Sequence, residues 1–456
     1  MAGIGFELRK LLRAESYLGL LRAYTYASII SSGPWVFSIV GLIAVGVLSL
    51  GVVTPDTLIT QFQVTVTYLI MASLILTGGL QLGFTRWVAD RLFEKRHADI
   101  APAYLGVMLV TTAVSGSLGW AAALLGFHGV SNLYRVLIVV GLTLLANLWI
   151  TTVFLSGLKQ YRAIVGLYAL GYGMSVLLSY LARPWGLQGL LLGFLGGQFT
   201  MWVLMLWLVL RNFPLSRPIN LNCFGRRQMY VALLAGGTLY NLGVWADKLT
   251  FWFTAGTSNP VIGPLRASTI YDLPVFLAYL CVLPGMGIFL VKFETDFVEW
   301  YDKFYTAVRE GGALQDIARY HDGMQAVVRE GLYQILKVQA LTLLAVYTFV
   351  PQLFAWIGIS SLYIPLFLVQ AVAASFQVML LAVLNVFYYL DRRRDVVLLT
   401  ATLTVLNFAL SLLSIHLGPE FFGYGFAVTL LVTLMLGMLL LQRLFRKLEY
   451  ETFMLQ

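Results

Sequence analysis

The chain has 456 residues, of which 59% are hydrophobic and only 11% are charged, and its mean hydropathy is +0.83. A soluble domain carries about 25% charged residues, so this composition excludes a soluble enzyme and predicts an integral membrane protein. The net charge of +9 does not indicate nucleic-acid binding, because the basic residues are spread over short loops. Cys223 and Cys281 fall in a basic loop and an apolar segment, so we expect neither a disulfide nor a Cys/His metal site.

The first 22 residues predict an amphipathic helix. Ile4, Leu8 and Leu11 fall on one helical face, with charged residues such as Glu7 and Arg9 opposite. This pattern is typical of a helix lying in the membrane interface, although the same face could dock a partner. The apolar segment that follows lacks a small-residue cleavage site, so we expect it to be retained.

Apolar stretches long enough to cross a bilayer recur along the rest of the chain. The twelve predicted spans are 23–50, 62–84, 101–126, 136–157, 163–181, 189–210, 230–253, 267–291, 332–357, 363–390, 396–417 and 425–442. A connector at 211–229 divides them into an N-terminal lobe (23–210) and a C-terminal lobe (230–442), and a tail follows at 443–456. The predicted fold is therefore all-α, with two six-helix bundles that enclose a path between them, as in transporters.

The distribution of positive charge predicts the orientation. Of the 30 Lys and Arg residues, all but Arg135, Arg183, Arg266 and Lys248 fall on one side of this topology. Cytoplasmic loops carry an excess of Lys and Arg, so we expect both termini in the cytoplasm.

Several spans carry packing or bending signals. Gly189, Gly193 and Gly197 recur every four residues, which lets a neighbouring helix approach closely. The stretch Ser31-Ser-Gly-Pro-Trp35 predicts a break in the first span, and Pro274 and Pro284 interrupt the eighth. For any one proline, an ordinary kink is the simpler interpretation.

Three charges lie within predicted spans. Asp247 and Lys248 precede a short turn at 256–264, and Asp272 follows it, so all three should lie at similar depth toward the outer side. An intramembrane charge normally faces a partner or a wet cavity. Hydrogen-bonding groups and ring faces nearby complete the predicted transport path: Tyr240, Asn241, Trp245, Arg266 and Tyr271. The alternative is a structural ion pair in which Lys248 neutralises Asp247 or Asp272.

The longest connection, 292–331, predicts cytoplasmic amphipathic helices interrupted at Gly311-Gly312. It could dock a cytoplasmic protein or lie on the membrane surface. The docking candidates are the apolar face and its flanking acids: Phe293, Phe297, Trp300, Phe304, Glu294 and Glu299. His321 has no neighbouring His or Cys, so we interpret it as a solvated helix residue.

No phosphate-binding loop or nucleotide-binding domain is visible, so we expect neither catalysis nor a cofactor in this chain. Transport would then depend on an ion gradient, the gradient of the substrate, or a partner. The loop after the second span departs from the major facilitator signature, because Arg86 and Glu94 stand where that signature has glycine.

Three segments carry a family resemblance. Residues 1–12 (MAGIGFELRKLL), 31–35 (SSGPW) and 293–301 (FETDFVEWY) resemble the PelG family of exopolysaccharide export proteins. That family belongs to the multidrug/oligosaccharidyl-lipid/polysaccharide (MOP) exporter superfamily, and the resemblance covers the length of the chain. It implies a transporter in the bacterial inner membrane that moves an amino-sugar polymer outward. It also implies a cytoplasmic glycosyltransferase and membrane partners, one of which senses cyclic di-GMP.

Two other functions stay open from the residues alone. A flippase of lipid-linked oligosaccharide would need a lateral groove for the lipid tail. A small-molecule cation antiporter would need a titrating carboxylate, for which Asp247 and Asp272 are the candidates.

Overall fold

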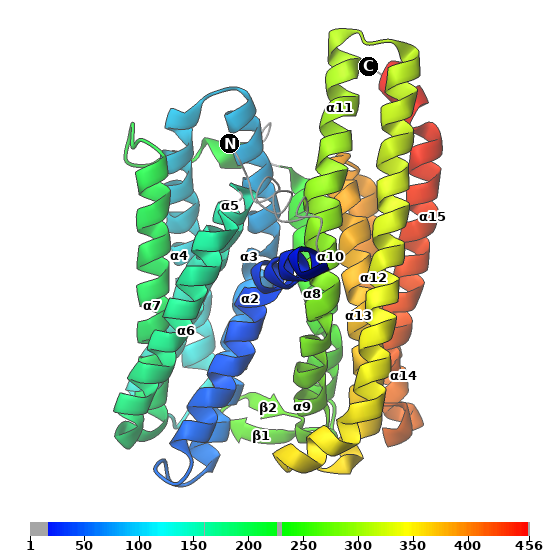
Figure 1. The fold of residues 1–456 in the computed structure, drawn as a ribbon. Coiled ribbons are helices and arrows are strands. Elements are labelled where there is room, and N and C mark those ends of the chain that lie inside the picture. Colours follow the sequence, from blue (N-terminus) through cyan, green and yellow to red (C-terminus); the bar gives the residue numbers. More distant parts are fainter. Residues whose placement is uncertain (1–16, 159, 226–229, 455–456) are drawn as a thin grey trace. The chain divides into compact units, whose positions relative to one another are not determined.

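A computed structural model describes residues 17–158, 160–225 and 230–454 (Figure 1). Over these residues the chain is helical apart from one small hairpin. Nine helical segments in these ranges are long and apolar enough to cross a membrane, or ten if one bent pair counts as a span. The predicted all-α membrane fold is confirmed, while the number of twelve crossings stays a prediction. Most of the expected 1–22 helix lies outside the described residues, since α2 begins at Tyr17.

The chain forms two compact units, Gly33–Thr269 and Met1–Ser32 with Ile270–Gln456. Within the described residues, the first unit contains the end of α2 (Tyr17–Ser49), six further α-helices and two strands. These are α3 (Thr57–Phe93), α4 (Ile100–Gly126), α5 (Asn132–Gly157), α6 (Tyr161–Ala182), α7 (Gly186–Asn212), α8 (Val231–Phe253) and the strands β1 (Asn259–Ile262) and β2 (Leu265–Ala267). The expected division into lobes at the connector stays a prediction, although α8, which follows that connector, packs within this unit.

The glycine repeat of α7 packs against α6. A Cβ atom on Gly193 would lie 2.2 Å from the backbone nitrogen of Ser179, and one on Gly197 would lie 2.3 Å from that of Ser175. The hydroxyls of both serines donate back to carbonyls of α7, at Leu190 (3.0 Å) and Phe194 (2.9 Å). The close approach predicted from the four-residue spacing is therefore confirmed.

A second glycine contact joins α3 to α8. A Cβ atom on Gly237 would lie 2.2 Å from the carbonyl oxygen of Gly78. One on Gly79 would lie 2.4 Å from the carbonyl oxygen of Leu234. The two backbones touch at this crossing, so no side chain fits between them.

The connector between α7 and α8 is bonded to the start of α4. The Ser216 hydroxyl donates to the carbonyl of Ala98 (2.7 Å), and the Arg217 guanidinium pairs with Asp99 (2.9 Å). The backbone N–H of Asn220 donates to the carbonyl of Pro102 (2.9 Å). This segment therefore lies along its own unit.

The turn expected at 256–264 is instead a β-hairpin. Strands β1 and β2 pair antiparallel, with Pro260 opposite Arg266 and an irregularity between Pro260 and Ile262. The hairpin is tied to α3, because Gln61 Nε2 donates to the carbonyl of Val261 (3.3 Å). The hydrophobicity pattern did not indicate strands, since the segment is too short to alternate.

The second unit is built from helices that follow the hairpin. They are α9 (Thr269–Ala278), α10 (Leu283–Val291), α11 (Phe297–Glu310), α12 (Leu314–Ile357), α13 (Ile364–Tyr389), α14 (Arg393–Leu417) and α15 (Tyr424–Met454). Within this unit, α11, the first half of α12 and the end of α15 extend past α13 and α14 (Figure 1). Gly311, at φ +70°, ends α11 and lets the chain turn into α12, as the Gly311-Gly312 pair predicted.

The predicted break in the first span is present, and the eighth span is interrupted before Pro284, whereas Pro274 lies within the continuous helix α9 and does not interrupt it. The eighth span passes from α9 through a 3₁₀ turn (Tyr279–Val282) into α10, which begins one residue before Pro284, and then through a π-helical turn (Lys292–Asp296) into α11. The parts of α2 on either side of Pro34, Tyr24–Pro34 and Val36–Ser49, meet at 61°. The boundary between the two units falls beside this bend, after Ser32.

The α3–α8 crossing predicts opposite effects for two glycine substitutions. Gly237→Ala should cost about 1–3 kcal/mol, because its methyl group overlaps backbone that cannot move aside. Gly166→Ala on α6 has no atom within 4 Å of the new Cβ, and should be neutral or stabilising by up to about 1 kcal/mol. Thermal unfolding midpoints in detergent measure both. Equal midpoints for the two variants would contradict the tight crossing.

Candidate transport site

Asp247 and Lys248 form a buried ion pair on α8. The Lys248 ammonium lies 3.1 Å from each carboxylate oxygen of Asp247 and donates to the carbonyl of Val244 at 3.1 Å. The exposed fractions of the two residues are 0% and 1%. Removing two charges from water is costly unless they neutralise each other, so the pairing explains how both reside here. The ion-pair alternative is thereby confirmed for Asp247, and a role of the pair in transport stays a prediction.

Aromatic rings surround this pair. Trp245 lies under the Lys248 ammonium, with 5.9 Å between the nitrogen and the ring centroid. Trp252, one turn after Lys248 on α8, stacks on Tyr68 of α3 at 4.5 Å between ring centroids. Trp245 and Trp252 are 6.2 Å apart. The part of α8 that carries the charges therefore lies in an apolar, aromatic environment within the Gly33–Thr269 unit.

Arg266 fastens the hairpin to the end of α8. Its guanidinium donates to the hydroxyl (2.9 Å) and carbonyl (2.9 Å) of Ser258 and to the carbonyl of Trp252 (3.1 Å). The hydroxyl of Tyr68 donates to the carbonyl of Arg266 at 2.9 Å. The Ser258 hydroxyl also donates to the Trp252 carbonyl (2.6 Å), so Arg266 and Ser258 together tie the hairpin to the end of α8.

Asn241 and Tyr240 lie near the glycine crossing and are half-buried. Asn241 Nδ2 donates to the carbonyl of Gly237 (3.2 Å) and lies 2.2 Å from where a Cβ of Gly78 would stand. The asparagine therefore occupies space that the glycine leaves open. In the Gly33–Thr269 unit, the structure brings together five predicted path residues on α8 and Arg266 at its end.

Asp272 and Tyr271 belong to the other unit. Asp272 is half-buried in the first turn of α9, where the positive end of a helix stabilises a carboxylate. The Tyr271 hydroxyl, in a side chain that is only 1% exposed, accepts a hydrogen bond from Gln370 of α13 at 2.9 Å. Each of the three charges that the sequence places in the membrane is therefore compensated by a neighbouring group, either the opposite charge of the ion pair or the start of α9.

The apolar face of the 292–331 segment is covered by helices of its own unit. Phe293, Phe297 and Phe304 are fully buried, and Phe293 packs against Gly331 of α12. Phe297 meets Tyr389 of α13 at 5.7 Å. An outside partner cannot reach these three rings. The docking hypothesis therefore depends on the opposite flank of α11, where Glu299 and Trp300 are half-buried and Lys303 pairs with Glu299 at 2.6 Å.

His321 is buried, in contrast to the solvated residue that its isolation in the sequence predicted. It is 8% exposed, and its Nε2 lies 3.0 Å from the carbonyl oxygen of Phe445 on α15. Phe304 and Phe445 flank the ring at 6.3 and 5.9 Å. The expectation was wrong because the end of α15 packs against this part of α12.

Glu294 makes contacts that the sequence did not indicate. Its two carboxylate oxygens accept hydrogen bonds from Asn385 Nδ2 and from the Tyr389 hydroxyl, each at 2.9 Å. Glu294 lies in the π-helical turn, which changes the face on which the following residues fall.

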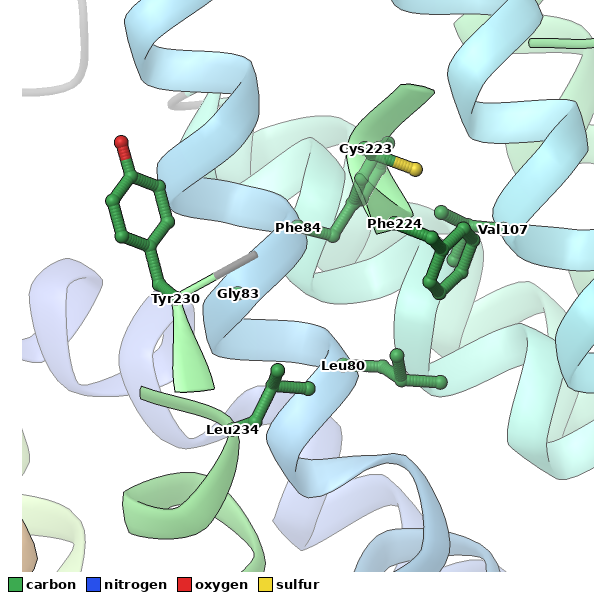
Figure 2. A pocket seen from close by; sticks show the side chains of 8 residues that line it. All are labelled: Leu80, Gly83, Phe84, Val107, Cys223, Phe224, Tyr230 and Leu234. Carbon is green, nitrogen blue, oxygen red and sulfur yellow. The ribbon is translucent and has the colours of Figure 1, made fainter. Parts of the chain in front are cut away.

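A small apolar pocket lies in the Gly33–Thr269 unit (Figure 2). Leu80, Gly83 and Phe84 of α3 line it together with Val107, Cys223, Phe224, Tyr230 and Leu234. The Tyr230 hydroxyl points away from this lining and donates to Asp90. Nothing in the pocket combines charge with hydrogen-bonding groups, so it is a packing feature beside the connector. Among the described residues, no group of three or more His, Cys, Asp or Glu could hold a metal ion.

Residues 1–453 match the model of one protein family, "PelG: Putative exopolysaccharide Exporter (EPS-E)". The chain belongs to the PelG family. The resemblance to this family that its first residues and residues 293–301 carry is confirmed. The family match and the several candidate membrane-spanning helices together make this chain a membrane transporter. No curated protein matches the chain.

Solved transporters share the fold of this PelG-family chain. An outward-facing multidrug resistance MATE family transporter of the MOP superfamily gives a TM-score of 0.70 at 14% identity, over 94% of this chain and 96% of the other. A MOP superfamily transporter from Pyrococcus furiosus gives 0.65 at 13% identity, over 94% and 96%. A MATE protein in complex with MaD5 gives 0.67 at 14% identity, over 96% and 98%. At such low identity the likeness shows the MOP-type fold and nothing about substrate.

Breaking the ion pair should destabilise the protein more than removing it. Lys248→Met or Asp247→Asn leaves one buried charge without its partner, at a cost of about 3–5 kcal/mol. The double variant Asp247→Asn/Lys248→Met removes both charges and should recover most of that loss. Thermal unfolding of the four proteins in one detergent gives the coupling. Additive losses in the double variant would contradict a mutually neutralising pair.

Burial raises the pKa of the Cys223 thiol to about 11. Only the thiolate reacts with maleimides or iodoacetamide, so at pH 8 Cys223 should react roughly two orders of magnitude more slowly than an exposed cysteine. The rate should then rise about tenfold per pH unit between pH 8 and 10. A Cys281→Ala background leaves Cys223 as the one thiol, and the SDS-denatured protein gives the exposed reference rate. Equal native and denatured rates at pH 8 would contradict the burial.

Proposed function

We propose that this protein moves a Pel-like amino-sugar exopolysaccharide from a cytoplasmic glycosyltransferase across the bacterial inner membrane to the periplasm. The family match over residues 1–453 carries the proposal, and the MOP-type fold supports it. The concentration of Lys and Arg on one side of the spans supports cytoplasmic termini.

The polar groups of α8 are suited to a neutral polymer. An N-acetylated amino sugar presents hydroxyl and acetamide groups together with an apolar ring face, and carries no charge. Tyr240 and Asn241 are half-buried and offer a ring face and an amide, while Asp247 and Lys248, buried beside Trp245, balance each other. On the other unit, Asp272 is half-buried beside the buried Tyr271, and Arg266 fixes the hairpin at the end of α8.

The same geometry disfavours Asp247 as the exchanging carboxylate of a cation antiporter. Such a transporter depends on a carboxylate that exchanges a proton or metal ion for the substrate. Both oxygens of Asp247 already contact the Lys248 ammonium, so a cationic substrate would have to displace a buried lysine. A flippase of lipid-linked oligosaccharide stays as the alternative, because it would handle the same sugar groups.

In this proposal the chain is not an enzyme, because polymerisation belongs to the glycosyltransferase. That enzyme, and a membrane partner that senses cyclic di-GMP, are partners proposed from the family. The outward flank of α11, with Glu299 and Trp300, is the proposed contact for one of them, because Phe293, Phe297 and Phe304 already pack inside the unit.

Reconstitution with the glycosyltransferase tests the function. Vesicles that contain both proteins and an activated N-acetylhexosamine donor outside should accumulate polymer inside, protected from an added glycosidase. Vesicles with the glycosyltransferase alone should leave the polymer outside. Repeating the assay with and without a proton or sodium gradient identifies the energy source. Lipid-linked oligosaccharide, added as a second substrate, distinguishes a flippase from a polymer exporter. Transport of that compound without transport of free polymer would contradict the proposal.

A further inference from the structure

Three tyrosine rings form a continuous surface at the inner end of the second unit. Tyr301 and Tyr305 lie one helical turn apart on α11, with 4.6 Å between ring centroids. Tyr389, at the end of α13, lies 5.8 Å from Tyr301. All three are half-buried, whereas the supporting Phe297 and Phe304 are fully buried. We call Tyr301, Tyr305 and Tyr389 the tyrosine shelf.

A carboxylate and an amide border the shelf. The Tyr389 hydroxyl donates to one oxygen of Glu294, and Asn385 Nδ2 donates to the other, at 2.9 Å in each case. The Asn385 Oδ1 atom is shielded from solvent and has no hydrogen-bond partner among the residues that the structure describes. An amide oxygen left unpaired beside a carboxylate is costly unless a donor reaches it, so this end of the shelf is suited to a ligand rich in O–H and N–H groups.

Glu294 and the two tyrosines of α11 lie on one side of the eighth span. Lys292, at the start of the π-helical turn, points to α12, where its ammonium lies 3.1 Å from Glu330. Glu294, two residues later, points to α13. Tyr301 and Tyr305 follow Glu294 at helical spacing and fall on the same face, and Tyr301 lies beside Tyr389. Turns of the π type are rare in helices and are frequent at functional sites.

We propose that the tyrosine shelf, with Glu294 and Asn385, binds an N-acetylhexosamine unit of the polymer at the cytoplasmic end of the transporter. The apolar face of a pyranose ring packs on Tyr301, with the Tyr305 ring, tilted by 50°, at its side. Its hydroxyl and acetamide groups exchange hydrogen bonds with Glu294 and Asn385. This inference rests on the proposed function for its substrate, and it assigns a binding role to residues that otherwise would only join α11 to α13.

A structural clamp is the competing interpretation, because the Glu294 hydrogen bonds already tie the eighth span to α13. A contact that only joins the two helices requires that Glu294 and its hydrogen-bond donors be buried. It does not require Tyr301 and Tyr305 to be only half-buried, as they are. Trp300 and Tyr320 provide the comparison, since their rings lie 6.2 Å apart on another side of the α11–α12 hairpin, with Gly323 against Trp300.

Direct binding tests the shelf. The full-length protein in nanodiscs is titrated with an N-acetylglucosamine pentamer, followed by isothermal calorimetry, with maltopentaose as the sugar without acetamide groups. Tyr301→Ala should weaken binding of the N-acetylglucosamine pentamer about three- to tenfold, the effect of losing one stacked ring. Tyr301→Phe keeps the ring and should bind as the native protein does. Glu294→Gln should weaken binding, and Tyr320→Ala, the matched control, should leave it unchanged.

Two results would overturn sugar binding by the tyrosine shelf. One is no binding of millimolar pentamer by the native protein, and the other is equal affinity of Tyr301→Ala and Tyr320→Ala for the pentamer. Loss of glycosyltransferase co-purification in Tyr301→Ala with sugar binding intact would also overturn it, and would identify a protein interface. Thermal midpoints identify a variant that fails to fold, in which case Tyr305→Ala replaces it. The vesicle assay is independent: polymer uptake without shelf binding contradicts the shelf alone, and shelf binding without uptake contradicts the export function alone.

Discussion

Contact between the backbones of α3 and α8 determines where the polar groups of α8 lie. The helices meet at Gly78, Gly79 and Gly237, where even a methyl group would overlap a carbonyl. Because α8 is fixed at this height and rotation, Asn241 fits beside the crossing, and Trp252 reaches Tyr68. Membrane helices gain little from hydrophobic association, so close packing of small residues is what holds such a pair.

Local neutrality is the second constraint, and it bears directly on substrate. A low-dielectric environment tolerates charge only where it is compensated, and the chain compensates each charge close by. Lys248 neutralises Asp247, the start of α9 stabilises Asp272, and Asn385 and Tyr389 donate to Glu294. What such groups still offer is hydrogen bonding without net charge. That chemistry suits an uncharged polyhydroxylated chain better than a cation.

Sequence reasoning found the features that depend on local pattern. Most helix positions, the glycine repeat against α6, the bend at Pro34 and the turn at Gly311 all follow from hydrophobicity or from special backbone residues. It placed the Asp247–Lys248 pair among its alternatives, because two opposite charges adjacent in a span have few other partners. It missed features that need a distant partner: the burial of His321 by α15, and the covering of Phe297 by α13.

The extension of α11, α12 and α15 shows why an amphipathic segment is a poor indicator of a docking surface. The apolar face of α11 had the composition of a binding site, yet the chain supplies its own partners for Phe293, Phe297 and Phe304. Once that face is buried, only the residues along its edges can contact a ligand or partner. These edges combine half-buried aromatic rings with carboxylates. Glu294 and Tyr301 share such an edge because they are spaced at two helical turns, but periodicity alone does not reveal that Tyr389 of α13 completes it. The chemistry of this edge therefore depends on a contact between helices distant in the sequence as much as on the local pattern of the eighth span.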